Sequence, residues 1–144
     1  MDGQTLPASS ETSVVVSYVP IQDTGDQGNF VIYSDDLDEP WENIIQSTSN
    51  DIADLITENK PFFNAKKILA DAFNQETSSG GERYPVVKSQ LINGMKQGAL
   101  VINYFGHGGE DGLARERIFD KIDAAEITND KFNCFVSVTC EFTK

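Results

Sequence analysis

The sequence predicts an α/β fold with a mainly parallel sheet. Short apolar runs of strand length alternate with segments of helical periodicity, in the order strand, helix, strand, helix, strand, helix, strand. This order is typical of parallel strands joined by right-handed crossovers. The clearest strand is residues 99–105, in which six of seven residues are apolar and a glycine stands on each side. Such a strand is typical of the centre of a sheet that is covered on both faces.

Composition and charge limit the classes of function. The 144 residues fit one domain, and 39% hydrophobic residues are enough to build a buried core. The formal net charge of -12 and the lack of a Lys/Arg cluster argue against binding to nucleic acid or anionic lipid, because both are polyanions. No apolar run is long enough to span a membrane, and residues 1–12 lack the pattern of an export signal.

The chain is expected to divide near residue 28. Residues 1–28 are predicted to form a polar tail, a short edge strand at residues 14–16 and a loop. The first core strand is predicted at residues 30–33, where four apolar residues precede an acidic segment. We therefore expect the folded domain to begin at residue 29.

A first helix is predicted to start at Pro40, because proline suits the first helical position. Apolar residues then recur on one face at positions 41, 44, 45, 52, 55 and 56, which predicts an amphipathic helix lying on the sheet. The residues before it, Asp35, Asp36, Asp38 and Glu39, offer oxygen ligands for calcium. They lack the glycine and the spacing of a calcium loop, so a solvated helix entrance is the favoured interpretation.

The middle of the chain predicts a weak second strand at residues 65–71, a polar loop at residues 75–83 and a second helix from Pro85. Gly98 is expected to end this helix, since glycine readily adopts the left-handed conformation found at helix C-termini. One face of the helix is apolar and is expected to face the core: Tyr84, Val87, Leu91 and Met95.

The last part of the chain predicts a polar segment at residues 110–117, a short helix within residues 118–129 and a core strand at residues 132–140. Cys134 and Cys140 both fall in that strand, on the same face and too far apart to pair with each other. Cys134 lies mid-strand beside large apolar residues, so we expect it to be a core residue.

Two predicted core strands end in reactive side chains, His107 and Cys140, which are 33 residues apart in the chain. If the strands are neighbours, the imidazole can favour the thiolate and protonate a departing amine, which suits acyl transfer at a peptide bond. The N–H groups of Gly108 and Cys140 are candidate donors to the oxyanion. The alternative is a buried, inert cysteine and a structural histidine, and composition and spacing favour that alternative over the dyad.

Metal and nucleotide sites are weaker interpretations. His107, Cys134 and Cys140 have the right ligand types for zinc but not the close cysteine spacing of a structural site, so no metal site is predicted there. The glycines at residues 106–109 do not follow a phosphate-binding pattern, and the Gly80–Gly81 loop lacks the lysine of one.

Four segments together resemble the gingipain-like cysteine peptidases: the Asn-Tyr-Phe-Gly-His-Gly-Gly run at residues 103–109, Val-Thr-Cys-Glu-Phe at residues 138–142, Gln-Glu-Thr-Ser at residues 75–78 and Arg-Tyr-Pro at residues 83–85. Within that family they are most similar to the signal peptidase, or sortase, of the Bacteroidetes type IX secretion system. The resemblance covers residues 29–144. It implies a caspase-like three-layer α/β sandwich, of which this segment is the amino-terminal part.

The resemblance implies that His107 is the general acid/base, that Cys140 is the nucleophile and that Gly108 lies at the oxyanion position. It implies removal of carboxyl-terminal sorting domains from secreted cargo, with the new end joined to lipopolysaccharide, at the outer membrane and cell surface. Cargo proteins and other secretion components are the partners it implies. No cofactor is required, although relatives bind calcium. The residues around Cys140 differ from the caspase signature, so caspase-type aspartate specificity is not implied.

A second interpretation stays open at this point. The chain stops four residues after the last predicted strand, so we expect it to be a fragment of a larger catalytic unit. A caspase-like scaffold or interaction module that keeps the motifs without catalytic activity fits the same residues.

Overall fold

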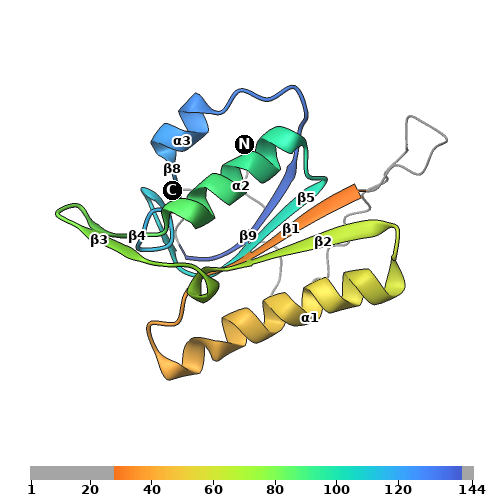
Figure 1. The fold of residues 1–144 in the computed structure, drawn as a ribbon, viewed down its shortest axis with the longest axis horizontal. Helices are drawn as coiled ribbons and strands as arrows, with labels where there is room; N and C mark the ends of the chain where they lie inside the picture. The colour runs from red at the N-terminus through yellow and green to blue at the C-terminus, as the bar shows by residue number, and fades with distance from the viewer. Residues whose placement is uncertain (1–27, 141–144) are drawn as a thin grey trace, which may run out of the picture.

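A four-stranded parallel sheet forms the centre of the protein (Figure 1). The structure is a computed structural model that describes residues 28–140. Its sheet has the order β2-β1-β5-β9, in which β1 is Gly28–Ser34, β2 is Phe63–Leu69, β5 is Val101–Phe105 and β9 is Cys134–Val138. The prediction of a mainly parallel α/β sheet with residues 99–105 at an inner position is confirmed.

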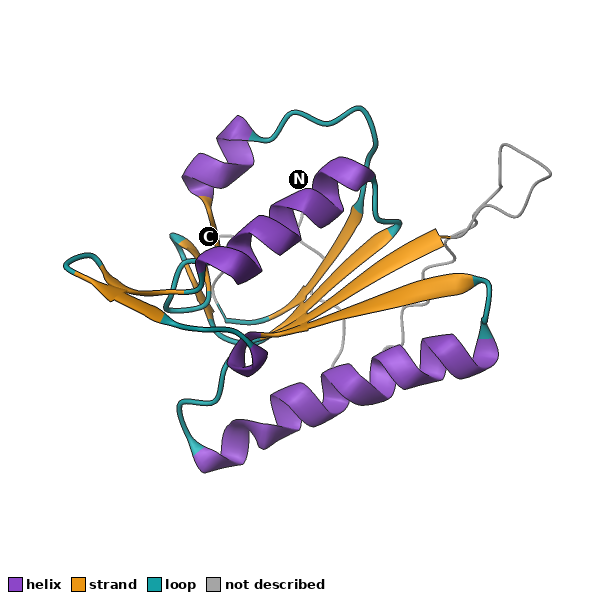
Figure 2. Ribbon diagram, in the orientation of Figure 1, coloured by secondary structure: helices purple, strands orange, loops and turns teal. Residues whose placement is uncertain are grey.

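Helices cover both faces of this sheet (Figure 2). Helix α1 (Asn43–Asn59) lies on one side, and α2 (Pro85–Gln97) and the short α3 (Lys121–Glu126) lie on the other. This arrangement is a three-layer α/β/α sandwich and is compatible with the expected caspase-like fold. Among the described residues, no helix combines the length and apolar character needed to cross a membrane.

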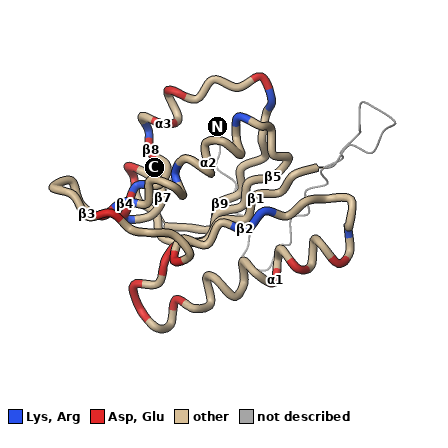
Figure 3. Tube along the Cα trace, viewed as in Figure 1, with Lys and Arg blue, Asp and Glu red and all other residues tan. Residues whose placement is uncertain are grey.

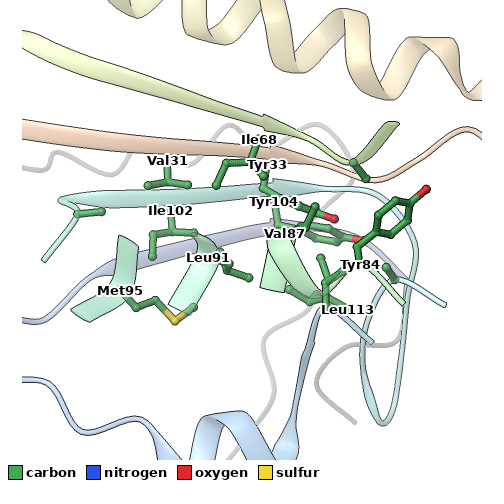
Figure 4. Close-up of a cluster of buried hydrophobic side chains, with 14 residues drawn as sticks. Val31, Tyr33, Ile68, Tyr84, Val87, Leu91, Met95, Ile102, Tyr104 and Leu113 are labelled. Atoms are coloured by element: carbon green, nitrogen blue, oxygen red, sulfur yellow. The ribbon is translucent and has the colours of Figure 1, made fainter. Parts of the chain in front are cut away.

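The main core lies between the sheet and α2 (Figure 4). The apolar face predicted for α2 is confirmed, because Tyr84, Val87, Leu91 and Met95 are all buried. They pack against residues of β1, β2 and β5: Val31, Tyr33, Ile68, Ile102 and Tyr104. Burying each such aliphatic side chain stabilises the fold by about 1.5–3 kcal/mol.

Gly98 ends α2 as predicted. It has φ 83°, in the left-handed region, and its N–H donates to the carbonyl of Met95 over 3.0 Å. The N–H of Ala99 donates to the carbonyl of Gly94, so this turn feeds the chain directly into β5.

The predicted apolar face of the first helix is only partly correct. Residues 40–42 form a separate 3-10 turn, and the buried residues of α1 are Ile45, Ser49 and Ala53. Trp41, Ile44 and Leu55 are 66%, 58% and 62% exposed. The apolar residues of the sequence pattern occupy a wider arc of the helix than the face that is buried. The buried face is narrow and includes two small residues, Ser49 and Ala53.

Two predicted loops contain short strands. Residues 75–83 hold the hairpin of β3 (Glu76–Ser78) and β4 (Gly81–Arg83). The segment after β5 holds a second small sheet of β6 (Gly108–Gly109), β7 (Gly112–Leu113) and β8 (Phe119–Asp120). These pairings were missed because strands of two or three residues are too short to show hydrophobic alternation.

The last strand is shorter and more exposed than predicted. Strand β9 ends at Val138, so Cys140 follows the strand instead of lying in it. Cys134 is exposed, which contradicts its predicted place in the core. Cys134 pairs in register with Val101 of β5, and within residues 28–140 its own strand β9 comes last in the sheet order. Helix α1 makes its main sheet contacts with β1 and β2. The predicted edge strand at residues 14–16 lies outside the described residues.

Candidate active site

The carboxyl ends of β1, β5 and β9 meet at one edge of the sheet. Ser34 pairs with Phe105, and Phe105 pairs with Val138. His107 follows β5 by two residues and Cys140 follows β9 by two residues, so the register continues to place them on neighbouring strand ends. The N–H of Gly106 donates to the carbonyl of Val138 over 3.2 Å, which holds the two ends together.

His107 is fixed from both its backbone and its ring. Its N–H donates to Asp35 Oδ2 over 2.8 Å, and its carbonyl accepts from the N–H of Ala114 over 2.9 Å and from the Tyr104 hydroxyl. The ring atom Nε2 lies 2.7 Å from Glu42 Oε1. The side chain of His107 is 29% exposed, so it can reach a substrate while its orientation is set by buried groups.

Glu42 is a site residue that the sequence analysis missed. Its side chain is only 2% exposed, although it stands at the start of a surface helix. Oε2 accepts the N–H groups of Asp38 (2.7 Å) and Glu39 (2.8 Å), which leaves Oε1 for His107.

The environment of Glu42 keeps it charged. Burial acts to raise the pKa of the Glu42 carboxyl, but the N–H of Glu39, the His107 ring and the N–H of Asp38 outweigh burial, so the pKa lies below its usual value. An ionised carboxylate beside Nε2 orients the imidazole and fixes which ring nitrogen carries the hydrogen. A glutamate three positions after Glu39 in a capping arrangement was the available sequence signal.

Cys140 is exposed, and the chain around it lies close to Gly108. A Cβ at position 108 would collide with the Thr139 side chain and lie 3.0 Å from the carbonyl oxygen of Cys140. Only glycine therefore fits between the β6 hairpin and the segment that carries Cys140. The predicted site residues His107, Gly108 and Cys140 are thus brought to one place.

The Gly108 N–H is not used by the hairpin in which it lies. Gly108 faces Leu113 across the β6–β7 pair, and the flanking bond runs from the N–H of Ala114 to the carbonyl of His107. This is the pattern of a non-hydrogen-bonded pair in an antiparallel ladder. The Gly108 N–H therefore remains a donor for a ligand oxygen.

A cluster of three buried carboxyl groups lies beneath His107: Asp35, Asp36 and Glu116. Asp35 and Asp36 are 1% and 8% exposed, so the predicted solvated helix entrance is wrong for these two residues. Tyr84 donates to Asp36 Oδ2 over 3.1 Å, and the Tyr104 hydroxyl lies 3.3 Å from Asp35 Oδ2. The prediction failed because Asp35 and Asp36 directly follow the inner strand β1 and are still buried, whereas Asp38 and Glu39 further along the chain are exposed. Figure 3 shows acidic residues continuing along the turn from β1 to α1.

Burial and mutual repulsion make two of these carboxyl groups, Asp35 and Glu116, hard to ionise. Burial raises the pKa of Asp35 to about 7; the His107 N–H opposes this shift, and Asp36 and Glu116 add to it. Burial likewise raises the pKa of Glu116. No Lys or Arg within residues 28–140 forms an ion pair with any of the three carboxyl groups.

The same cluster fits a calcium ion by donor chemistry. One carboxylate oxygen from each of Asp35, Asp36 and Glu116 lies within 4.8 Å of the other two. The Tyr33 hydroxyl, fully buried and without a hydrogen-bond partner, interacts electrostatically with all three. Hard oxygen donors without a counter-ion are the ligands that calcium takes. A second group, Asp38, Glu42 and His107, is already engaged in the contacts of the site.

A cleft of about 350 Å³ opens beside His107. We call it the His107 cleft; it is lined by His107, Gly108, Asp111, Ala114, Arg115 and Arg117, together with nearby glycines. One wall is held to the turn after β1, because Arg115 Nη1 lies 2.7 Å from Asp38 Oδ2. The cleft therefore begins at two of the predicted site residues.

Comparison with family models supports the chemistry that this geometry suggests. The model of Peptidase family C25 matches residues 15–144, which is most of the chain. Comparisons with curated proteins and with solved structures found no match. The resemblance on residues 75–85, 103–109 and 138–142 is thereby confirmed at the level of the family. The chain belongs to peptidase family C25, the gingipain family of cysteine peptidases.

Proposed function

We propose that this protein provides the catalytic residues of a cysteine endopeptidase or transpeptidase, with Cys140 as nucleophile and His107 as general acid/base. The observation that carries the proposal is the convergence of His107 and Cys140 on neighbouring parallel strand ends, with the histidine held by Glu42 and Asp35. Membership of a cysteine peptidase family supports the same chemistry.

The proposed reaction begins with attack of the Cys140 thiolate on the carbonyl carbon of a peptide bond. A C–S bond forms, and the carbonyl oxygen becomes an oxyanion that accepts from the N–H groups of Gly108 and Cys140. The protonated His107 ring gives its proton to the amide nitrogen as the C–N bond breaks and the amine leaves. Water or a second amine then attacks the thioester and gives its proton to the neutral His107 ring. The C–S bond breaks, and Cys140 leaves as the thiolate beside a protonated His107, which restores the starting state.

Glu42 acts in this mechanism as a positioning residue. Its carboxylate lies 2.7 Å from Nε2, so it fixes the ring orientation and leaves the other ring nitrogen, Nδ1, to protonate the leaving amine. Asp35 positions the same residue through the backbone N–H of His107. Neither carboxyl group is required to touch the substrate.

We further propose that Asp35, Asp36 and Glu116 hold a calcium ion. When bound, the ion supplies positive charge that neutralises three buried carboxylates, and so it stabilises the strand end from which His107 is positioned. The fit of three oxygen donors without a counter-ion supports this role.

The finer biological role that we propose is removal of carboxyl-terminal sorting domains from type IX secretion cargo at the outer membrane and cell surface, with other secretion components as partners. The supporting observation is the similarity of residues 103–109 and 138–142 to the signal peptidase of that system. Purified cargo that carries its sorting domain tests this role, because the full-length protein should shorten it and the Cys140→Ala variant should not.

The peptidase proposal is tested by comparing Cys140→Ala with Cys134→Ala in the full-length protein. Both cysteines are exposed, so the second variant is a matched control for loss of a thiol. We expect peptide cleavage to vanish in Cys140→Ala and to stay within about twofold of the parent in Cys134→Ala. Equal activity in the two variants, or no activity in the parent, would support a non-catalytic scaffold instead.

A further inference from the structure

The His107 cleft carries positive charge in a protein whose formal net charge is -12. Three of its lining side chains are ionic: Asp111, Arg115 and Arg117. Two of them have counter-ions, since Lys121 Nζ lies 3.1 Å from Asp111 Oδ1 and Arg115 Nη1 lies 2.7 Å from Asp38 Oδ2. Their charges are therefore largely balanced within the protein.

Arg117 is different. It is exposed, and within residues 28–140 its guanidinium has no hydrogen bond or ion pair; its charge acts on Asp120 only at longer range. A guanidinium presents several N–H donors in a planar fork that matches a carboxylate. An unpaired guanidinium in a cleft that starts at His107 is thus available to an anionic group of a bound ligand.

The turn that carries Arg117 has an unfavourable backbone conformation. Its φ is 53° and that of Ala114 is 59°, and both lie in the left-handed region that residues other than glycine rarely adopt. The turn is held because the N–H of Arg117 donates to the carbonyl of Ala114 (3.3 Å), and the N–H of Ala114 donates to the carbonyl of His107 (2.9 Å). Unfavourable backbone conformations of this kind cluster at ligand-binding sites. The turn that presents Arg117 is therefore hydrogen-bonded directly to the candidate catalytic histidine.

We propose that Arg117 is a specificity-determining residue that binds an Asp or Glu side chain of the substrate beside the scissile bond. The inference rests on the proposed peptidase function and adds its substrate class. An acidic side chain within two residues of the bond pairs with the Arg117 guanidinium in the His107 cleft. The uncharged amide of Asn or Gln has the same shape but forms a weaker contact there.

The test measures peptide binding by calorimetry to the full-length Cys140→Ala variant, which cannot cleave its ligand. Blocked peptides carry a single Asp at each of four positions around the scissile bond, and matched peptides carry Asn instead. At one position we expect the Asp peptide to bind about tenfold more tightly than the Asn peptide. Adding Arg117→Ala should reduce this ratio to about one, and Arg117→Lys should keep part of it.

Lys66→Ala is the control, because Lys66 is an exposed cation on β2 away from the cleft and its loss changes net charge equally. It should leave the Asp/Asn ratio unchanged. The proposal would be overturned if the Asp and Asn peptides bound equally at all four positions, or if neither bound detectably. It would also be overturned if the Asp/Asn affinity ratio were unchanged by Arg117→Ala. Absence of cleavage by the parent protein would instead contradict the peptidase function, so the two failures are distinguishable.

Discussion

The two flanks of the candidate site are built very differently. On the β1 side, His107 is held by buried groups, Asp35 and Glu42, above a core that is packed between the sheet and α2. On the β9 side, Cys140 is exposed, and Val136 and Val138 of the strand that leads to it are 40% and 54% exposed. The comparison indicates that the proposed acid/base is preorganised by the fold, whereas the proposed nucleophile is exposed at the end of a strand whose valines are also exposed.

The largest expected effect is on stability: a substitution in the core on the β1 side should destabilise the fold far more than one on the β9 side. Leu91 is 1% exposed in the core of the packed flank, and Phe132 is 97% exposed just before β9. Leu91→Ala should lower the free energy of unfolding by about 2–5 kcal/mol, because it leaves a cavity beside the sheet. Phe132→Ala should change it by less than about 0.5 kcal/mol. Denaturant unfolding of both variants measures the difference, and similar losses would contradict the contrast between the flanks.

The next effect tests the contact between the flanks at Gly108. A Cβ there would collide with Thr139 and press on the Cys140 carbonyl, whereas a Cβ at Gly109 meets nothing within 4 Å. Gly108→Ala should therefore reduce kcat by about 10²–10³-fold by displacing an oxyanion donor and the nucleophile. Gly109→Ala is the matched control and should keep most of the activity. Steady-state kinetics with a peptide substrate decide between these outcomes, and equal kcat values would argue against Gly108 at the oxyanion.

A smaller effect is expected from Glu42 on the packed flank. Glu42→Gln preserves the shape but removes the negative charge beside His107 Nε2, so kcat should fall by about 10–10²-fold, with little change in KM. The pH dependence of kcat should shift as well, which a purely structural role would not produce. Glu58→Gln, at an exposed position of α1, is the control for charge. An unchanged pH profile in Glu42→Gln would exclude the positioning role.

The smallest expected effect concerns the carboxyl cluster and its pH dependence. Since the pKa of Asp35 is raised to about 7 in the folded protein, the folded state should lose stability as pH rises from about 4 through 7. Asp35→Asn should raise Tm at pH 8 in a chelator and change it little near pH 4. Calcium should raise the Tm of the parent at pH 8 and have a much weaker effect on the variant. A calcium response equal in both proteins would rule out the proposed ligand set.

Much of this fold follows from patterns that local physics controls. The buried face of α2 and its end at Gly98 were predicted, because helical periodicity and a left-handed glycine are local signals. The parallel orientation of β1, β5 and β9 was predicted from alternating strands and helices, whereas their order in the sheet was not. The position of His107 at a strand end followed from the apolar run before it.

The parts that were not predicted depend on contacts distant in sequence. Glu42 was missed, since only the fold places it beside His107, 65 positions away. Asp35 was assigned to solvent because nothing local shows that Tyr104 and the His107 N–H cover it. Cys134 was assigned to the core because strand composition does not show where a strand falls in the sheet, and β9 comes last in the order found for residues 28–140. Arg117 gave no sequence signal, since its importance lies in its backbone conformation and its missing partner.

The most direct test of the dyad is the rate at which a peptide-based thiol electrophile labels Cys140, followed by intact mass in a Cys134→Ala background. Labelling of the parent should be fast and pH-dependent, because His107 assists formation of the thiolate. We expect His107→Ala to slow labelling by at least about tenfold and to change its pH dependence. An equal rate and pH profile with and without His107 would show that the two residues do not act together.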